Sequence, residues 1–272
     1  LSERGKMPGF RIRLSAALSV LRRPSTDFAA LPSPDVPICI IGDLHGRLDL
    51  LEQMLAQIGR QADAGRARIV FVGDLIDRGP DSAGVLRLVR ELTEARPEHV
   101  ICLMGNHERM LLDFMDAPRQ GGARWIANGG EETLISYGLN PWMPNAAGGA
   151  EDRLSALASS LQQALPEGME DWLRQLPLLW QEGGLAISHA GADPARAMAN
   201  QTADTLLWGH RAFLRQKRAD QIWVAHGHII VESVAAKDGR IAVDTGAWRR
   251  GRLSAAWLDH NGLSDLESQK AL

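Results

Sequence analysis

Five short apolar runs in this 272-residue chain each end in a cluster of polar residues. The clusters are Gly42-Asp43-Leu44-His45-Gly46, Gly73-Asp74-Leu75-Ile76-Asp77-Arg78-Gly79, Gly105-Asn106-His107-Glu108, Ser188-His189-Ala190 and His226-Gly227-His228. The runs have the length and composition of buried strands. No structural role needs so many ionisable groups at strand ends, so the pattern predicts a functional site there.

The first half of the chain alternates between two periodicities. Continuous apolar runs predict strands over 36–41, 69–72 and 100–104, and helical spacing of apolar residues predicts helices over 48–60 and 82–95. This order implies a parallel βαβ core, in which functional residues gather at the carboxyl ends of the strands.

The second half has a different pattern. Residues 109–180 are predicted to be mostly helical and to form a cap beside the site. Further strands are predicted over 185–188, 221–225, 231–235, 240–243 and 253–258, with a hairpin turn at Lys237-Asp238-Gly239. We expect an α/β (α+β) fold in which a second, largely antiparallel sheet packs face to face on the first, with helices outside.

Composition limits the protein class. Residues 36–260 are predicted to form one domain, after a basic N-terminal extension and linker over 1–35 and before a C-terminal tail over 261–272. A net charge of −3 argues against a nucleic-acid partner, and no run approaches a membrane span. Cys39 and Cys102 are interpreted as free core thiols, which favours a reducing, cytoplasmic location. Residues 11–23 are interpreted as a short basic helix.

The clusters contain a consistent set of metal donors. Six residues offer oxygen or nitrogen and none offers a thiolate: Asp43, His45, Asp74, Asn106, His189 and His228. This mixture suits Mn²⁺, Fe or Zn²⁺ better than a closed structural zinc site. Asp74, in the middle cluster of the first three, is the best candidate to bridge two ions, which can share a hydroxide in an in-line displacement.

Three further residues suggest phosphate chemistry. The Arg78 guanidinium can hold phosphate oxygens in a bidentate fork. His107 can protonate a leaving oxygen, and Asp77 can hold the correct tautomer of that ring. In isolation, a surface ion pair and a core histidine would explain these residues, but their position beside the metal donors favours catalytic roles.

The motifs Gly-Asp-x-His-Gly, Gly-Asp-x-x-Asp-Arg-Gly and Gly-Asn-His-Glu resemble those of the phosphoprotein phosphatase (PPP) family of metallophosphoesterases. Asn128-Gly129-Gly130 and Val243-Asp244-Thr245-Gly246 resemble its bacterial and phage branch, which includes lambda-type serine/threonine protein phosphatases and diadenosine tetraphosphatases. The resemblance implies a calcineurin-like fold of two packed mixed sheets, with two divalent ions, Mn²⁺ first.

The same resemblance assigns roles within the clusters. It implies Asp43, His45 and Asp74 on one metal, and Asp74, Asn106, His189 and His228 on the other. It implies an acid pair of His107 and Asp77, and phosphate binding by Arg78, Asn106 and His107. His228 is preferred to His226 because it completes the Gly-His pair of the family.

One position departs from the family pattern. A second phosphate-binding arginine is expected two residues after a tryptophan, where Leu207-Trp208-Gly209-His210-Arg211 has His210. Arg211 follows one residue later. Either Arg211 reaches the phosphate through a backbone adjustment, or Arg78 is the one arginine that binds phosphate. Arg211 is assigned to phosphate binding here.

The leading functional hypothesis is a metal-dependent serine/threonine protein phosphatase, in which a hydroxide bridging two metals attacks phosphorus directly. The alternative is a dinucleoside polyphosphate hydrolase, such as a diadenosine tetraphosphatase, with the cap and the loop near Trp208 selecting the substrate. The partner is then a phosphorylated protein or a small phosphorylated metabolite. Trp125, Trp142 and Trp208 could stack on a base, although core roles are favoured. A non-catalytic scaffold is disfavoured because all six donors are intact.

Overall fold

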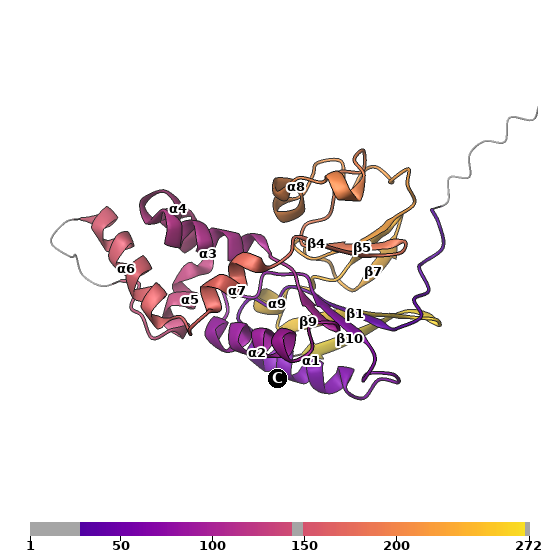
Figure 1. The fold of residues 1–272 in the computed structure, drawn as a ribbon, viewed down its shortest axis with the longest axis horizontal. Helices are drawn as coiled ribbons and strands as arrows, with labels where there is room; N and C mark the ends of the chain where they lie inside the picture. The colour runs from indigo at the N-terminus through magenta and orange to yellow at the C-terminus, as the bar shows by residue number, and fades with distance from the viewer. Residues whose placement is uncertain (1–27, 143–148, 270–272) are drawn as a thin grey trace, which may run out of the picture.

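The computed structural model describes residues 28–142 and 149–269. Two five-stranded sheets lie face to face in it (Figure 1), as the resemblance implied. The predicted basic helix over 11–23 lies outside the described residues. Among the helices of the described ranges, none has the length and apolar character that a bilayer crossing requires.

The first sheet contains the predicted βαβ core. Its strand order is β10 (Gly262–Gln269), β9 (Arg252–Asp259), β1 (Ile38–Ile41), β2 (Arg68–Phe71) and β3 (Val100–Cys102). β1, β2 and β3 are parallel, which confirms the predicted order, and β9 and β10 pair antiparallel. Helices α1 (Leu48–Ile58) and α2 (Ser82–Ala95) lie below this sheet in Figure 1.

The second sheet is mixed. Its order is β4 (Leu179–Glu182), β5 (Leu185–Ser188), β6 (Trp223–His226), β8 (Arg240–Ala242) and β7 (Ala235–Lys237). β5, β6 and β8 are parallel, so the expectation of a largely antiparallel sheet was wrong. The β7–β8 hairpin is confirmed, since Asp238 and Gly239 have φ of 52° and 78°. The strand predicted over 231–235 begins only at Ala235, because the Val231 N–H donates to Asp244 O instead of joining a ladder.

The C-terminal strands required two corrections. β9, predicted for the second sheet, lies beside β1 in the first. Residues 262–269, predicted to be part of a tail, form β10 along the full length of β9. β10 is a partly exposed edge strand, so its apolar alternation is weak, and backbone pairing holds it in place. His260 and Asn261 form the turn between them, and Gly262, with φ of 109°, begins β10 directly after it.

The core explains the continuous apolar runs of the parallel strands. Ile38 and Ile40 of β1 pack toward the second sheet, whereas Cys39 and Ile41 pack against the helix-covered side. Both faces of the strand are therefore buried, and a polar residue on either face would lose its water without gaining a partner. Cys39 and Cys102 are free and buried, as predicted.

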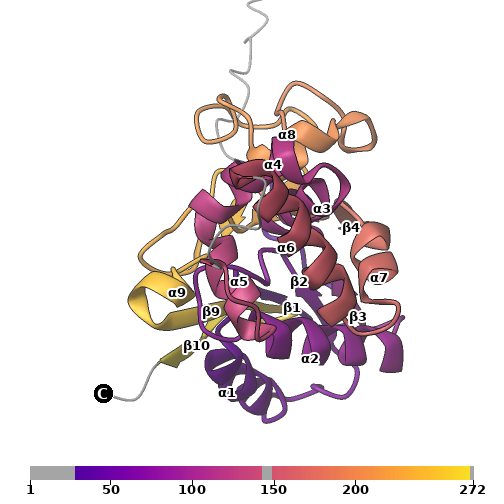
Figure 2. The ribbon, with the colours of Figure 1, turned by 90° about the vertical axis from the view of Figure 1, so that its left-hand side faces the viewer.

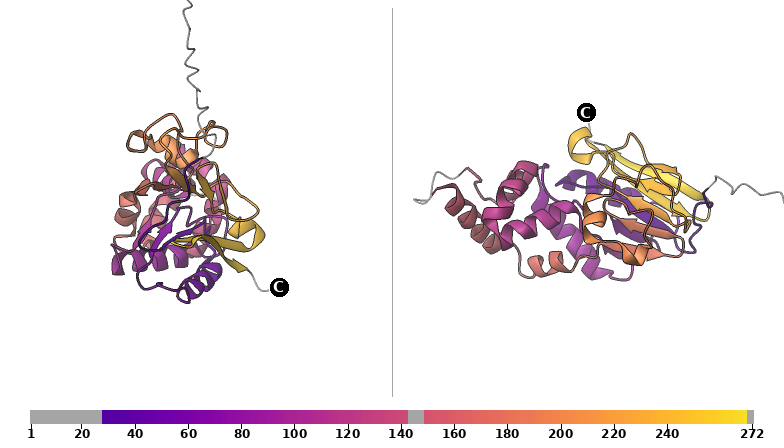
Figure 3. Two further views of the ribbon diagram at one scale, coloured as in Figure 1. Left: turned by 90° about the vertical axis from the view of Figure 1, so that its right-hand side faces the viewer. Right: turned by 90° about the horizontal axis from the view of Figure 1, so that it is seen from above.

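The predicted helical region forms a block at one end of the sheets (Figures 2 and 3). It comprises α3 (Asn106–Asp116), α4 (Pro118–Trp125), a π-helical turn (Ile126–Gly130), α5 (Glu131–Ser136), α6 (Ala150–Ala164) and α7 (Met169–Gln175). Two further short helices are α8 (Ala203–Trp208) and α9 (Ala247–Arg250), and α9 contacts β9 of the first sheet. Since α3 starts directly after β3, this block begins at the carboxyl edge of the first sheet.

Candidate active site

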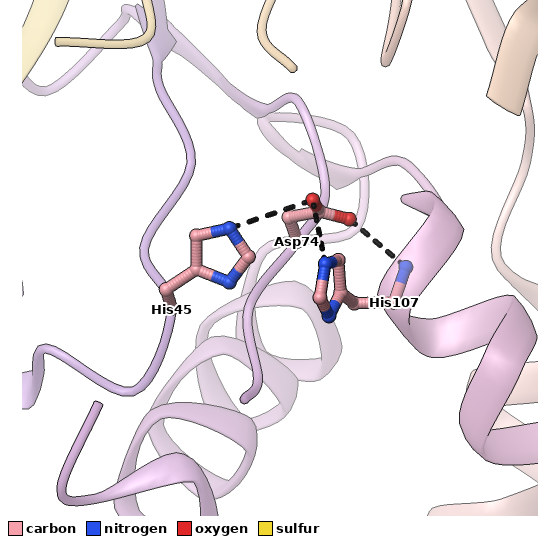
Figure 4. A group of neighbouring side chains, drawn as sticks. All are labelled: His45, Asp74 and His107. Carbon is pink, nitrogen blue, oxygen red and sulfur yellow. Dashed lines mark hydrogen bonds and ion pairs between the residues drawn. The ribbon is translucent and has the colours of Figure 1, made fainter. Parts of the chain in front are cut away.

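Asp74 lies at the centre of the polar clusters (Figure 4). Its Oδ2 is 3.6 Å from His45 Nε2 and 3.8 Å from His107 Nε2, while its Oδ1 is 3.4 Å from His189 Nε2. Burial alone would raise the pKa of the Asp74 carboxyl, but the surrounding histidines, His189 foremost, lower it. Asp74 is therefore a carboxylate placed where it can bridge two cations.

Two of the surrounding histidines are neutral and fixed in one tautomer. His45 Nδ1 donates to Ile76 O at 2.8 Å, and His189 Nδ1 donates to Val72 O at 3.0 Å. Burial lowers the pKa of His45 to about 3 and that of His189 to about 4. Each ring therefore presents an unprotonated Nε2 toward Asp74, the form in which histidine binds metals.

Beside Asp74, polar atoms of His189, Asn106 and His228 lie close together. His189 Nε2 lies 2.8 Å from Asn106 Oδ1 and 3.2 Å from His228 Nδ1. Burial lowers the pKa of His228 as well. Because the His189 Nε2 carries no proton, its lone pair faces that of Asn106 Oδ1, and a cation bound by both atoms would relieve this repulsion.

Asp43 lies beside this cluster. Its two carboxylate oxygens accept from the His228 N–H at 3.0 and 3.2 Å. Burial, and then the nearby carboxylates of Asp244 and Asp74, raise the pKa of Asp43 well above its ordinary value. A Cβ on Gly227 would lie 1.9 Å from Asp43 Oδ1, so only glycine fits there. A divalent cation would relieve this crowding of buried carboxylates, and the donor set suits one.

The side chains form two groups that can hold a metal ion and that share Asp74. One is Asp74 with His189 and His228, and the other is Asp74 with His45 and His107. The second group contains His107 in the place where we predicted Asp43. We interpret His107 as a proton donor, because it differs from the other histidines in both its partner and its protonation.

His107 is paired with Asp77. His107 Nδ1 lies 2.6 Å from Asp77 Oδ2, and neither side chain is more than 1 % exposed. Burial alone would lower the pKa of His107, but the charge of Asp74 and the hydrogen bond to Asp77 outweigh it and raise that pKa. The predicted acid pair is therefore brought together, with His107 favoured in its protonated form.

Two residues that support Asp77 were not predicted. Trp125 Nε1 donates to both Asp77 oxygens at 3.0 and 3.1 Å, and Thr133 Oγ1 donates to Oδ1 at 2.6 Å. Trp125 has no exposed surface, so it does not stack on a base. No local sequence pattern relates residues 125 and 133 to residue 77. They meet only because the helical region folds back onto the site.

Glu108 was also left without a role by the sequence. Its carboxylate accepts from three backbone N–H groups, those of Asp74, Leu75 and Gly105, at 2.8–2.9 Å. Burial and the neighbouring Asp74 charge raise the pKa of Glu108 to about 7. Glu108 thus joins the Gly73–Gly79 motif to the Gly105–Glu108 motif and fixes the backbone that carries Asp74.

Arg78 lies at the edge of the centre. Its Nη1 lies 3.0 Å from His45 Nε2, which agrees with an unprotonated nitrogen there. The Arg78 N–H donates to Gly129 O at 3.1 Å, and the side chain is only partly buried. Gly129 has φ of 103°, and a Cβ on it would lie 2.6 Å from Arg78 Cγ. The Asn-Gly-Gly motif therefore positions the arginine predicted to bind phosphate.

Three further residues singled out in the sequence are Arg211, His210 and His226. Arg211 is exposed, and no hydrogen bond or ion pair found within 28–142 and 149–269 joins it to the clusters. His210 Nδ1 lies 3.7 Å from Asp193 Oδ1. His226 is buried, with its Nδ1 2.9 Å from Gly227 O and its ring edge-on to Phe213. The geometry thus supports His228 over His226 and gives Arg211 no contact with the site.

Comparison with known proteins agrees with this arrangement. The family model for calcineurin-like phosphoesterases matches residues 36–230. The chain therefore belongs to the calcineurin-like phosphoesterase family and is a metallophosphoesterase. The solved structure of a protein serine/threonine phosphatase from Saccharomyces cerevisiae shares the fold, with a TM-score of 0.54 at 16% identity over 88% of this chain and 81% of that one.

Three relatives bear on the substrate. A symmetrical bis(5'-nucleosyl)-tetraphosphatase of Aromatoleum aromaticum is 33% identical over 62% of this chain and 51% of its own length. The asymmetrical bis(5'-nucleosyl)-tetraphosphatase PrpE of Bacillus mycoides is 27% identical over 79% of this chain and 87% of its own. Serine/threonine-protein phosphatase 1 of Salmonella typhimurium is 37% identical over 35% of this chain and 39% of its own. This chain thus spans about half of the first relative.

Proposed function

We propose that this metallophosphoesterase hydrolyses dinucleoside polyphosphates. Phosphoester hydrolysis is supported above all by the position of Asp74 between the neutral His45 and His189, with Arg78 at the edge of the same centre. Two of the three relatives described above are named bis(5'-nucleosyl)-tetraphosphatases, and their matches cover more of this chain than that of the protein phosphatase, which supports the substrate class. This was the alternative in the sequence analysis, and it is now preferred to a protein phosphatase.

The proposed metal ligands are the six predicted donors. Asp43, His45 and Asp74 would hold one divalent ion, and Asp74, Asn106, His189 and His228 the other. When bound, the two ions would supply Lewis acidity and a water of lowered pKa at neutral pH. The side chains that hold them are already oriented by Ile76 O and Val72 O, so binding needs little rearrangement of these rings.

Two residues would act on the substrate itself, and a third would orient one of them. Arg78 would bind the non-bridging oxygens of the phosphate under attack and hold it in line. His107 would deliver its Nε2 proton to the leaving oxygen, and Asp77 would keep the ring oriented through Nδ1. When a phosphoanhydride is cleaved, the leaving group is a nucleotide phosphate, and His107 would protonate its oxygen as the P–O bond breaks.

A serine/threonine protein phosphatase remains the second candidate. The observation that favours it is the match to serine/threonine-protein phosphatase 1. The matched segment is short, and the motifs for metal and phosphate are common to both activities, so it supports the chemistry more than the choice of substrate.

Turnover of two substrates by the full chain in Mn²⁺ separates the candidates. We expect kcat/KM for diadenosine tetraphosphate to exceed that for a phosphothreonine peptide by an order of magnitude or more. Chromatography of the products then distinguishes symmetrical cleavage, which gives two ADP, from asymmetrical cleavage, which gives ATP and AMP. A preference for the peptide would reject the proposal and favour the second candidate.

A further inference from the structure

Trp248 is an exposed tryptophan at the edge of the candidate active site. It lies on α9 and is 38% exposed, whereas Trp125, Trp223 and Trp257 are buried. An indole exposed to this extent loses the stabilisation that burial would give it. Trp248 had no role in the sequence analysis, so the reason for its exposure has to come from its neighbours.

Those neighbours are two residues of the centre. The Arg78 Cζ lies over the Trp248 ring at 5.1 Å from the centroid. The His45 ring meets Trp248 edge-on, with centroids 6.4 Å apart. The exposed indole is therefore next to the arginine proposed to bind phosphate and to a proposed metal ligand.

The helix that carries Trp248 is held on both sides of it. Ala247 is buried, and its carbonyl accepts from Nη1 of the buried Arg47 at 2.7 Å. Arg250 Nη1 donates to Val231 O at 2.8 Å. At the start of the helix, the Gly246 N–H donates to Asp244 Oδ1 at 2.8 Å. The backbone under Trp248 is thus fixed before any ligand binds, which reduces the entropy lost when a planar group stacks on the ring.

From these contacts we infer that Trp248 is a specificity-determining residue that stacks on the nucleobase of the substrate. In a nucleotide the base is joined through the ribose to the phosphate chain, so a phosphate on Arg78 brings a planar aromatic group near the exposed indole. Stacking on tryptophan accepts any base, because every base offers a π face. This inference rests on the proposed function, since it identifies the residue that would favour nucleotides over other phosphates.

The test compares two substrates with the same phosphoanhydride bonds, diadenosine tetraphosphate and inorganic tetrapolyphosphate. In Trp248→Ala, we expect KM for the dinucleotide to rise about tenfold or more, while KM and kcat for tetrapolyphosphate stay within about twofold. Trp248→Phe should restore most of the loss. The matched control is Trp142→Ala, which removes a tryptophan that is 60% exposed and that, within 28–142 and 149–269, has no ring contact with Arg78 or His45.

Two results would overturn the inference. An equal loss on both substrates would mean that Trp248 acts only by supporting Arg78. An unchanged KM for both would mean that the ring has no part in recognition.

A second assay separates this inference from the proposed function. If the wild-type chain does not cleave diadenosine tetraphosphate, the proposed function fails, and ADP and pyrophosphate are then compared as competitive inhibitors of p-nitrophenyl phosphate hydrolysis. If Trp248 stacks on the base, Trp248→Ala should raise the inhibition constant of ADP about tenfold relative to that of pyrophosphate. An unchanged ratio would reject base stacking independently of the natural substrate.

Discussion

His107 Nδ1 lies 2.6 Å from Asp77 Oδ2 in a pocket that excludes solvent from both side chains. Asp77 accepts further hydrogen bonds from Trp125 and Thr133, so its carboxylate cannot turn away from the imidazole. Two residues of the helical cap therefore hold the carboxylate of the proposed acid pair in place, although none of the proposed metal ligands lies within 109–180.

Asp77→Asn should lower kcat by about 10- to 100-fold. The amide removes the charge that holds the His107 ring in place and favours its protonated form. The loss should be larger for substrates with a poor leaving group, such as a serine phosphate, than for p-nitrophenyl phosphate, which needs little protonation. Steady-state kinetics on both substrates measure this difference. Equal losses on the two would show that Asp77 only maintains structure.

Trp125→Phe should lower the free energy of unfolding by about 1–3 kcal/mol, because a buried carboxylate loses a hydrogen-bond donor while the ring packing is largely kept. Urea denaturation monitored by circular dichroism measures the change. Trp257→Phe is the matched control, since Trp257 Nε1 donates at 3.3 Å to Asp259, which is a more solvated partner. The prediction is wrong if the two variants lose the same stability.

Gly129→Ala should reduce kcat/KM by about tenfold or more, because a Cβ there meets Arg78 and displaces the proposed phosphate ligand. Gly138→Ala provides the control. Gly138 also has positive φ, 74°, but a Cβ on it would have no atom within 4 Å. Both variants carry backbone strain, and only the first should lose activity. A comparable loss in both would attribute the effect to strain alone.

Arg78→Ala should lower kcat/KM by roughly 10- to 100-fold, as expected when a charge-assisted contact to phosphate is removed. Arg211→Ala should change it by no more than about twofold, because Arg211 is exposed and, within the described residues, has no hydrogen bond or ion pair to the centre. Kinetics on diadenosine tetraphosphate measure both. A large loss in Arg211→Ala would restore the original assignment of this residue to the phosphate site.

Most of the fold and the ligand types could be predicted from the sequence, because both come from local patterns. β1, β2 and β3 consist mainly of buried apolar residues, with Ile101 of β3 half-buried, and each strand is followed by a short motif with its own glycine. β10 was missed because an edge strand can be polar and still be held by its partner. The sheet to which β9 belongs was also missed, since strand order depends on contacts far apart in the chain.

The support around the site was less predictable for the same reason. Trp125 and Thr133 lie 48 and 56 residues from Asp77, and no local spacing relates them. Glu108 stood inside a motif that was recognised, but its function depends on the backbone N–H groups of another loop. Trp248 could be placed beside Arg78 only once the return of β9 to the first sheet had set the position of α9.

We propose that the polar ends of the strands form a centre for two divalent metals, and that this centre hydrolyses phosphoanhydrides. The most direct measurement strips the full chain with a chelator and titrates Mn²⁺ while following both bound metal and diadenosine tetraphosphate hydrolysis. We expect no activity in the stripped protein, full activity at two ions per chain, and loss of both binding and turnover in Asp74→Asn. Undiminished hydrolysis by the metal-free protein, or by Asp74→Asn without added metal, would contradict metal-dependent hydrolysis at this centre.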